Sequence, residues 1–200
     1  MIGLVQYVEK LQNTLSGSYN VMKNPVVADR TFLLAASHTC TLGRTFITRK
    51  DVIDKFDIQN IILVIAAENL NQVTELCRWL KENIREIANP GCEKYLTLIN
   101  LVVVFEKPVS DDIKKFVEHY FFSKSFLLSI HGWAQAGITG VCLYDGDVFC
   151  GKNVLEMKGL FDPKLCLNPP EAFIKQPQTG HTVVNNTSVK EEAVKWQSYF

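Results

Sequence analysis

The chain has 200 residues, of which 47% are hydrophobic, and this size and apolar share suit one folded domain with a core. Its 21 basic and 21 acidic side chains cancel, so the chain lacks the positive charge that favours binding to nucleic acid. No apolar run reaches the ~20 residues of a membrane-spanning helix, and the first residues do not resemble a signal peptide. We therefore expect a soluble, cytoplasmic protein that binds no nucleic acid.

The first part of the chain predicts a helix followed by antiparallel strands. Apolar residues recur at helical spacing before Gly17, which is expected to end the helix: Ile2, Val5, Val8, Leu11 and Leu15. Extended segments are predicted at residues 18–22, 31–37 and 44–48, with a turn near Gly43. Residues 51–56 are compatible with a helical turn.

Residues 60–105 predict a strand, a helix and a second strand, the unit around which the fold is organised. Residues 60–67 and 95–105 are nearly continuous apolar runs, typical of strands that are covered on both faces in a parallel sheet. Between them, one face of a helix is predicted to hold Leu70, Val73, Leu76, Cys77, Leu80, Ile84 and Ile87. We expect Asn89-Pro90-Gly91 to end this helix, with Gly91 in the left-handed turn.

A further helix is predicted from Ser110, whose hydroxyl can accept a hydrogen bond from a free backbone N–H at the N-cap. Asp111 and Asp112 follow it, where the helix dipole favours negative charge. The expected buried face holds Ile113, Phe116, Val117, Tyr120 and Phe121. Residues 125–130 fit either a continuation of this helix or a strand, and we favour a short strand because the serines before them weaken the helical pattern.

The clearest local pattern is a β-hairpin over residues 141–150. Asp145-Gly146 is typical of a two-residue type I′ turn and lies between two short apolar runs. Such a turn would pair Tyr144 with Asp147 and Leu143 with Val148.

The composition changes beyond Gly159, where four prolines fall close together: Pro163, Pro169, Pro170 and Pro177. We interpret residues 1–160 as one α/β domain and residues 161–200 as a proline-containing linker or arm. Phe173 and Ile174 are the expected contact if the arm lies along the domain.

The six cysteines form no Cys-x-x-Cys pair, and no histidine lies at zinc-finger spacing from them. We expect free thiols, no disulfide-linked partner, no metal and no cofactor. Neither a Gly-x-Gly-x-x-Gly fingerprint nor a Gly-Lys-[Ser/Thr] phosphate loop occurs, so nucleotide binding by either device is unsupported.

Two groups of side chains are candidates for catalysis, and each also has a structural explanation. His131 with Asp145 and Asp147 offers acid–base chemistry, but a strand end and a hairpin turn also explain these residues. His38 and Cys40 would share one face of a strand, although no third group that orients them can be named. We favour the structural explanation for both groups and expect no catalytic residue.

Three stretches carry a resemblance to a known family. They are the N-terminal helix followed by Tyr19-Asn20-Val21, the apolar run 101–105 leading into Pro108-Val109-Ser110-Asp111-Asp112, and residues 190–200. Together they resemble the cytosolic domain that precedes the membrane part of some bacterial rhomboid-type intramembrane serine proteases. The catalytic Gly-x-Ser of that family is absent, since no glycine has serine two positions later. The resemblance therefore implies a regulatory part whose active site lies elsewhere.

The sequence predicts a single α/β domain with a mixed β-sheet. Its parallel β-α-β core, at about residues 60–105, is joined by antiparallel strands and a C-terminal hairpin. The predicted function is that of a non-catalytic cytosolic binding or regulatory domain of a membrane-anchored, rhomboid-like protein, at the inner face of the membrane. Its partner would be another protein or the membrane-embedded remainder of the chain. The alternative is a small, soluble, hydrolase-like enzyme with a site at the carboxyl ends of the parallel strands, near Glu68, Glu106 and Asp145.

Overall fold

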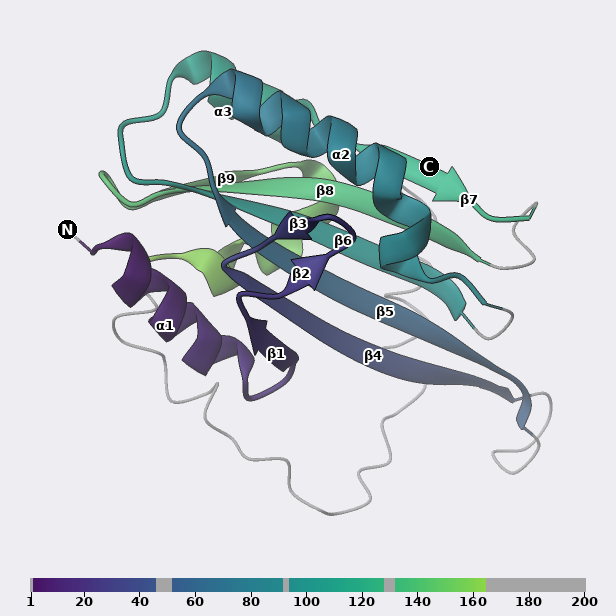
Figure 1. The fold of residues 1–200 in the computed structure, drawn as a ribbon. Helices are drawn as coiled ribbons and strands as arrows, with labels where there is room; N and C mark the ends of the chain where they lie inside the picture. Colours follow the sequence, from purple (N-terminus) through teal and green to yellow (C-terminus); the bar gives the residue numbers. More distant parts are fainter. Residues whose placement is uncertain (1, 46–51, 92–93, 128–131, 165–200) are drawn as a thin grey trace.

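The computed structural model describes residues 2–45, 52–91, 94–127 and 132–164. In this part of the chain a seven-stranded mixed sheet lies between two layers of helices (Figure 1). Helices α2 and α3 cover one face, and α1 and the 3₁₀-helix η1 cover part of the other. The predicted single α/β domain with a mixed sheet is confirmed.

The strands follow the order β1-β4-β5-β6-β8, and both β7 and β9 pair with the outer side of β8. The sheet contains β1 (Asn20–Lys23), β4 (Leu34–Thr45), β5 (Val52–Ala66), β6 (Lys94–Phe105), β7 (Phe122–Ser125), β8 (Trp133–Cys142) and β9 (Asp147–Cys150). β5, β6 and β8 run parallel, whereas β1, β7 and β9 pair antiparallel with their neighbours, as does β4 with β5. The parallel core and its antiparallel additions therefore agree with the prediction.

The larger of the two core clusters lies between the sheet and helices α2 (Leu70–Ala88) and α3 (Asp111–His119). The predicted apolar face of α2 is confirmed, since Leu80 and Ile84 are fully buried. The helix ends at Asn89, which takes the left-handed conformation (φ 42°) that we had expected of Gly91. Asparagine tolerates this conformation because its short side chain can hydrogen-bond locally. A two-stranded hairpin that the sequence did not reveal, β2 (Val26–Val27) and β3 (Arg30–Thr31), packs against this side.

The second cluster lies under α1 (Leu4–Leu15) and η1 (Lys152–Phe161). The buried face of α1 holds Tyr7, Leu11 and Leu15, whereas Val5 is 72% exposed, so the predicted apolar stripe was wrong at that position. Tyr7 belongs to the buried face because it lies four and eight residues before the two leucines. Its hydroxyl donates a hydrogen bond to the carbonyl of Phe161 (2.9 Å). Phe161 is fully buried, although it lies one residue beyond the predicted domain boundary.

β4 and β5 form one long antiparallel pair, and this corrects two predictions. Gly43 pairs with Lys55 inside the ladder, so β4 continues through the glycine instead of turning there. Residues 52–56 belong to β5 and not to a helical turn. The partner strand decides both positions, because ladder hydrogen bonds override the weak local preference of a glycine or of a few charged residues.

β4 is also an edge strand over much of its length. β1 pairs only with residues 34–37 of β4, so from His38 onward β5 is the single strand that pairs with it among the described residues. On its other side, no strand of the described ranges pairs with the backbone N–H and C=O groups of residues 38–45.

The predicted C-terminal hairpin exists, but its turn is longer than expected. Cys142 pairs with Asp147 and Val141 with Val148, which leaves a four-residue loop in place of the two-residue type I′ turn. A type I′ turn needs positive φ at both central residues, and here only Gly146 has it (φ 74°). The backbone N–H of Gly146 donates to the carbonyl of Cys142 (2.9 Å), which closes the loop.

Three smaller differences fall between residues 110 and 130. Ser110 is the N-cap of α3, but its side chain makes no capping hydrogen bond. Phe121 is 45% exposed, because the helix ends at His119 and the next residues enter β7. The predicted strand at 125–130 is replaced by β7, three residues earlier, and residues 128–130 lie outside the described part of the chain.

No helix in the described ranges is both long enough and apolar enough to cross a membrane.

Candidate functional site

The structure does not bring His38 and Cys40 into contact for catalysis. Both are exposed on β4, two positions apart on the same side of the strand. Such positions lie about 7 Å apart, which exceeds hydrogen-bond reach. The ring of His38 lies against that of Tyr19 instead, with 5.7 Å between the ring centres.

Asp145 and Asp147 shape the β8–β9 turn. The carboxylate of Asp145 accepts a hydrogen bond from the backbone N–H of Asp147 (3.0 Å), and the side chain of Asp147 pairs with Lys114 of α3 (2.7 Å). The third member of this predicted group, His131, lies outside the described residues.

The ionisation of this turn does not favour acid–base or nucleophilic chemistry. A hydrogen bond from the thiol of Cys142, and then one from the backbone N–H of Asp147, hold the pKa of Asp145 below its usual value. Burial raises the pKa of the Cys142 thiol. A hydrogen bond to Asp147 raises the pKa of Lys114. The carboxylate thus stays charged and the thiol stays protonated near neutral pH, which suits a structural turn.

The carboxylates of the alternative, enzymatic site do lie at the carboxyl ends of the parallel strands. Glu68 follows β5, Glu106 follows β6 and Asp145 follows β8, and all three are exposed. Glu68 approaches Lys107 at 3.9 Å, with both side chains more than two-thirds exposed, and a surface pair of this kind contributes little. In the described part of the chain no group of three or more His, Cys, Asp or Glu side chains could hold a metal ion.

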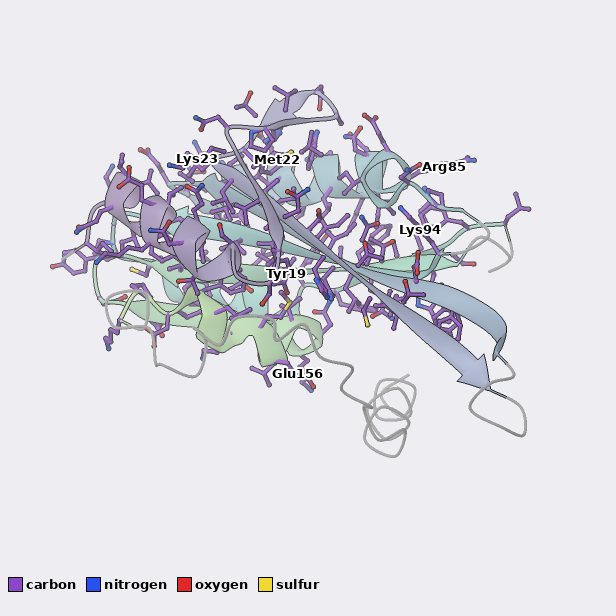
Figure 2. The ribbon with its side chains drawn as sticks, turned by 90° about the horizontal axis from the view of Figure 1, so that it is seen from below. Tyr19, Met22, Lys23, Arg85, Lys94 and Glu156 are labelled. Atoms are coloured by element: carbon purple, nitrogen blue, oxygen red, sulfur yellow. The ribbon has the colours of Figure 1, made fainter. Side chains whose placement is uncertain are left out.

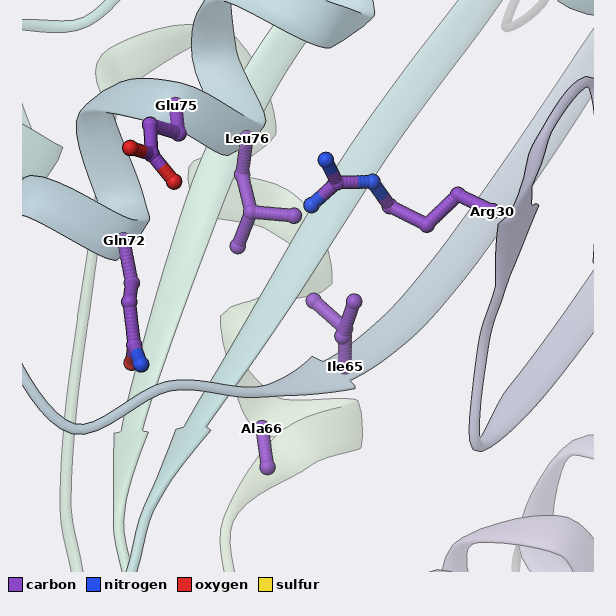
Figure 3. A pocket seen from close by; sticks show the side chains of 6 residues that line it. All are labelled: Arg30, Ile65, Ala66, Gln72, Glu75 and Leu76. Atoms are coloured by element: carbon purple, nitrogen blue, oxygen red, sulfur yellow. The ribbon is translucent and has the colours of Figure 1, made fainter.

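A shallow hollow of about 280 Å³ lies near this edge, but none of the three carboxylates lines it (Figure 3). Its walls come from the end of β5, the first turns of α2 and β3: Arg30, Ile65, Ala66, Gln72, Glu75 and Leu76. Arg30 also lies over the ring of Trp79, at 5.4 Å from the ring centre.

The topology of the parallel strands bears on ligand binding at this edge. In open α/β sheets, ligands bind where neighbouring crossovers leave the sheet on opposite faces. Here α2 and α3, which connect the parallel strands in succession, pack on the same face. The arrangement therefore contains no switch point between β5, β6 and β8.

The described elements α1 and η1 cover only part of the other face of the sheet. Seen from below, the far ends of β4 and β5 extend past α1 and η1 (Figure 2). The side chains that alternate onto this uncovered half form a surface that we call the open face. It comprises His38, Cys40, Phe56, Ile58, Asn60, Tyr95, Leu96, Leu98, Trp133 and Gln135. None of the apolar members belongs to either core cluster.

Three aromatic side chains gather at one end of the open face. The ring centre of Tyr95 lies 5.1 Å from that of Phe56 and 4.6 Å from that of Trp133. A register shift between β5 and β6 accounts for this contact, because it leaves Tyr95 as an extra residue that can turn to the same side as its neighbour Leu96. All three rings are half-buried, and we call them the aromatic cluster.

Polar side chains cross the sheet beside these rings. One row follows the register His38, Asn60, Leu98 and Gln135, next to the row of Cys40, Ile58, Leu96 and Trp133. Two rows on one face are separated by about 7 Å, so the amides of Asn60 and Gln135 lie next to an apolar strip.

Two further amides lie where the open face meets η1. Asn100 of β6 is 1% exposed, and its Oδ1 accepts a hydrogen bond from the Thr139 hydroxyl (3.0 Å). Its Nδ2 is buried without a partner among the described residues, as is Oδ1 of Asn153 in η1. Asn153 lies directly over Gly137, where a Cβ would come within 2.6 Å of it. Gly137 pairs with Asn100 in the β6–β8 register, so the unpaired donor and the unpaired acceptor belong to the same buried region under η1.

A family model, described as Domain of unknown function (DUF8052), matches residues 5–163. The chain belongs to this family. The match extends from the first turn of α1 to just past η1, so it covers both layers of helices and the whole described sheet. No curated protein and no solved structure matches the chain. The description of the family names no activity, and the resemblance to rhomboid-type proteases stays a prediction.

The open face was not predicted, although the sequence contains part of the pattern that indicates it. Residues 56–59 alternate apolar and polar side chains, as do residues 96–98, and such alternation is typical of a strand with one face less buried. The meeting of Phe56, Tyr95 and Trp133 could not be read from the sequence, because it depends on the register of three strands.

Proposed function

We propose that this domain is a non-catalytic binding domain that holds an extended polypeptide segment on its open face. The observation that supports the proposal is the half-buried aromatic cluster of Phe56, Tyr95 and Trp133, which lies outside both core clusters. As a second part of the proposal, the domain acts in the cytoplasm on a protein partner.

The apolar strip supplies the affinity in this proposal. Large aromatic side chains bury a large contact area and lose little conformational freedom on binding. They dominate the energetics of many interfaces. The strip lies outside both core clusters, so covering it would gain burial that folding does not already provide.

The amide of Asn60 supplies the orientation. An extended peptide that crosses the strands along the apolar strip presents backbone N–H and C=O groups at its edge. Asn60 is half-buried, and its amide matches these groups because it carries both a donor and an acceptor.

Nucleic acid fits this surface less well. Bases stack on the free flat faces of aromatic rings in positively charged grooves. Here the rings are tilted against one another, by 48° for Phe56 and 55° for Trp133 relative to Tyr95, and the chain carries no net charge.

The proposal can be tested by selecting random twelve-residue peptides, displayed on phage, against the full chain. We expect enriched peptides to lose at least about tenfold in affinity when Trp133→Ala or Phe56→Ala replaces the wild type, as aromatic anchors of an interface do.

Tyr144→Ala is the matched control, because Tyr144 is an aromatic residue that is 53% exposed at the carboxyl edge of the sheet. It should leave the affinity unchanged. Peptides that bind the Trp133 variant equally well, or that fail with the Tyr144 variant, would overturn the proposal, and the latter would favour the carboxyl edge as the site.

A further inference from the structure

We propose that the hollow between the β2–β3 hairpin and the start of α2 binds a free amino acid with an apolar side chain. Two side chains of opposite charge line this hollow, Arg30 and Glu75, together with the apolar side chains of Ile65 and Leu76 (Figure 3). The hollow lies on the face of the sheet that α2 covers, so it is separate from the open face. The inference therefore goes beyond the proposed function.

Arg30 is placed to receive the carboxylate of the ligand. Its guanidinium lies over the ring of Trp79, 5.4 Å from the ring centre, and the indole N–H of Trp79 donates to the carboxylate of Asp29 in the hairpin turn. The contact with the ring positions the guanidinium without using its N–H donors, and no ion pair of the described residues involves Arg30. A planar guanidinium matches a carboxylate, which accepts two parallel hydrogen bonds from it.

Glu75 supplies the opposite charge. Gln72, Glu75 and Leu76 lie on one face of α2, because residues three and four positions apart are neighbours on a helix. Among the ion pairs of the described residues, none joins Glu75 to Arg30, although both side chains line the hollow. The carboxylate of Glu75 disfavours a simple anion such as phosphate, because two negative charges would lie close together. It favours a ligand that carries an amino group as well as a carboxylate.

The end of β5 adds a peptide group with one side open. β6 pairs with β5 as far as Ala66, whereas β4 pairs with it only as far as Val64 in the described ranges. The carbonyl of Val64 points to the β4 side, where it accepts a hydrogen bond from the N–H of Leu33 (2.9 Å). Because alternate residues of a strand direct their N–H and C=O to the same neighbour, those of Ala66 also point to the β4 side, and no described strand pairs with them there. This N–H can donate to the carboxylate of the ligand, and this C=O can accept from its ammonium.

The size and the lining of the hollow limit the ligand further. Its volume of about 280 Å³ lies just below the range of about 300–1,000 Å³ that is typical for drug-sized ligands, so a smaller molecule fits. Ile65 and Leu76 offer an apolar contact to one side chain. A residue inside a peptide chain has neither a free carboxylate nor a free ammonium on its backbone, and a terminal residue has one of them. A free amino acid such as leucine has both.

Fluorine NMR of the full chain, labelled with 5-fluorotryptophan, tests the site with L-leucine as the probe. Trp79 reports on the hollow through its contact with Arg30, and Trp133 in the aromatic cluster is the internal reference. We expect L-leucine at millimolar concentration to shift the Trp79 resonance saturably and to leave that of Trp133 in place. An unmoved Trp79 resonance would overturn the inference. A shift of Trp133 in its place would also overturn it, because the open face would then be the site.

Two analogues of leucine separate the two charges. N-acetyl-L-leucine lacks the ammonium and L-leucinamide lacks the carboxylate, so each should bind the wild-type chain at least about tenfold more weakly than L-leucine. Glu75→Gln should weaken the binding of L-leucine by about tenfold, but it should not weaken that of N-acetyl-L-leucine, which has no ammonium to lose a partner. Arg30→Met should likewise weaken the binding of L-leucine and not that of L-leucinamide. The analogues need no substitution, so they test the inference even if one variant fails to fold.

Arg78→Met and Glu82→Gln are the matched controls, because both residues are exposed on α2 and neither lines the hollow. They should leave the affinity for L-leucine unchanged. Equal losses in the control and test variants would overturn the inference, as would analogues that bind as tightly as L-leucine. This test follows Trp79 and the peptide selection depends on Trp133, so the failure of one proposal is distinguishable from the failure of the other.

Discussion

Tyr7 joins the first helix of the chain to its last described element. Its ring is fully buried, and its hydroxyl donates to the carbonyl of Phe161 across 154 residues of sequence. Tyr7→Phe removes only this donor and leaves a buried carbonyl without it. We expect a loss of about 1–3 kcal/mol in the free energy of unfolding, measured by urea denaturation.

Tyr144→Phe is the control for Tyr7, because it removes the same group from a side chain that is 53% exposed. It should change the free energy of unfolding by less than about 0.5 kcal/mol. Equal losses in the two variants would contradict a specific role of the buried hydrogen bond.

Asp145 should make the stability of the fold depend on pH. Its pKa in the folded chain is lowered by hydrogen bonds from Cys142 and the backbone N–H of Asp147, so the charged carboxylate stabilises the folded state at pH values above the unfolded pKa of about 4. This contribution is lost as the pH falls through the folded pKa.

We therefore expect Asp145→Asn to be less stable than the wild type at pH 7, with the difference shrinking below about pH 4. Urea midpoints at pH 7 and pH 3 measure it. A difference of the same size at both pH values would show that the amide disturbs the turn for reasons other than charge.

At the scale of elements, the faces of α2 were assigned from the periodicity of its apolar residues alone. Leu80 lies in the middle of the buried face and is fully buried, whereas Glu82 is exposed. Leu80→Ala should cost about 2–5 kcal/mol because it leaves a cavity in the larger core cluster. Glu82→Ala should cost less than about 0.5 kcal/mol. Similar denaturant midpoints for the two variants would mean that the helix faces are assigned wrongly.

The elements that could be predicted are those whose own residues determine them. The period of α2 and the two apolar runs around it follow from burial, so α2, β6 and the end of β5 agree closely with the prediction, whereas β5 begins eight residues before the predicted run. The predictions that were wrong concern segments whose conformation depends on residues elsewhere in the chain. Gly43 and residues 52–56 become strand because each lies opposite the other in the β4–β5 ladder. The hairpin turn lengthens because Asp145 bonds to the backbone of the loop instead of taking positive φ.

The candidate site shows the same division. Four residues were candidates because their side chains are reactive: Asp145, Asp147, His38 and Cys40. For the two aspartates, the predicted structural role in a turn agrees with the hydrogen bond and the ion pair that they make. The open face was not predicted because its aromatic residues come from three separate strands. Phe56, Tyr95 and Trp133 become neighbours only through the order and register of β5, β6 and β8.

At the scale of the whole molecule, the described core ends at η1. Phe161 fills the cluster under α1, so a chain that ends after Gly159 should lose about 3–5 kcal/mol, the cost of removing a buried phenylalanine. A chain that ends after Lys164 keeps this side chain. It should lose less than about 2 kcal/mol, because the last described residue of either core cluster is Phe161.

Thermal melting of the two truncated chains beside the full chain measures the difference. A chain ending after Lys164 that fails to fold would show that residues beyond it belong to the core, and would contradict an arm that begins there.

The unpaired side of β4 has a consequence for the protein in concentrated solution. From His38 to Thr45 no strand in the described part of the chain pairs with its outer backbone donors and acceptors, and its sequence includes several threonines, which favour extended backbone. Few charges interrupt it, whereas natural edge strands are commonly protected by lysine, proline or a covering loop. Two copies that meet at this edge would continue one sheet into the next, so the solubility of the protein should depend on what shields these eight residues.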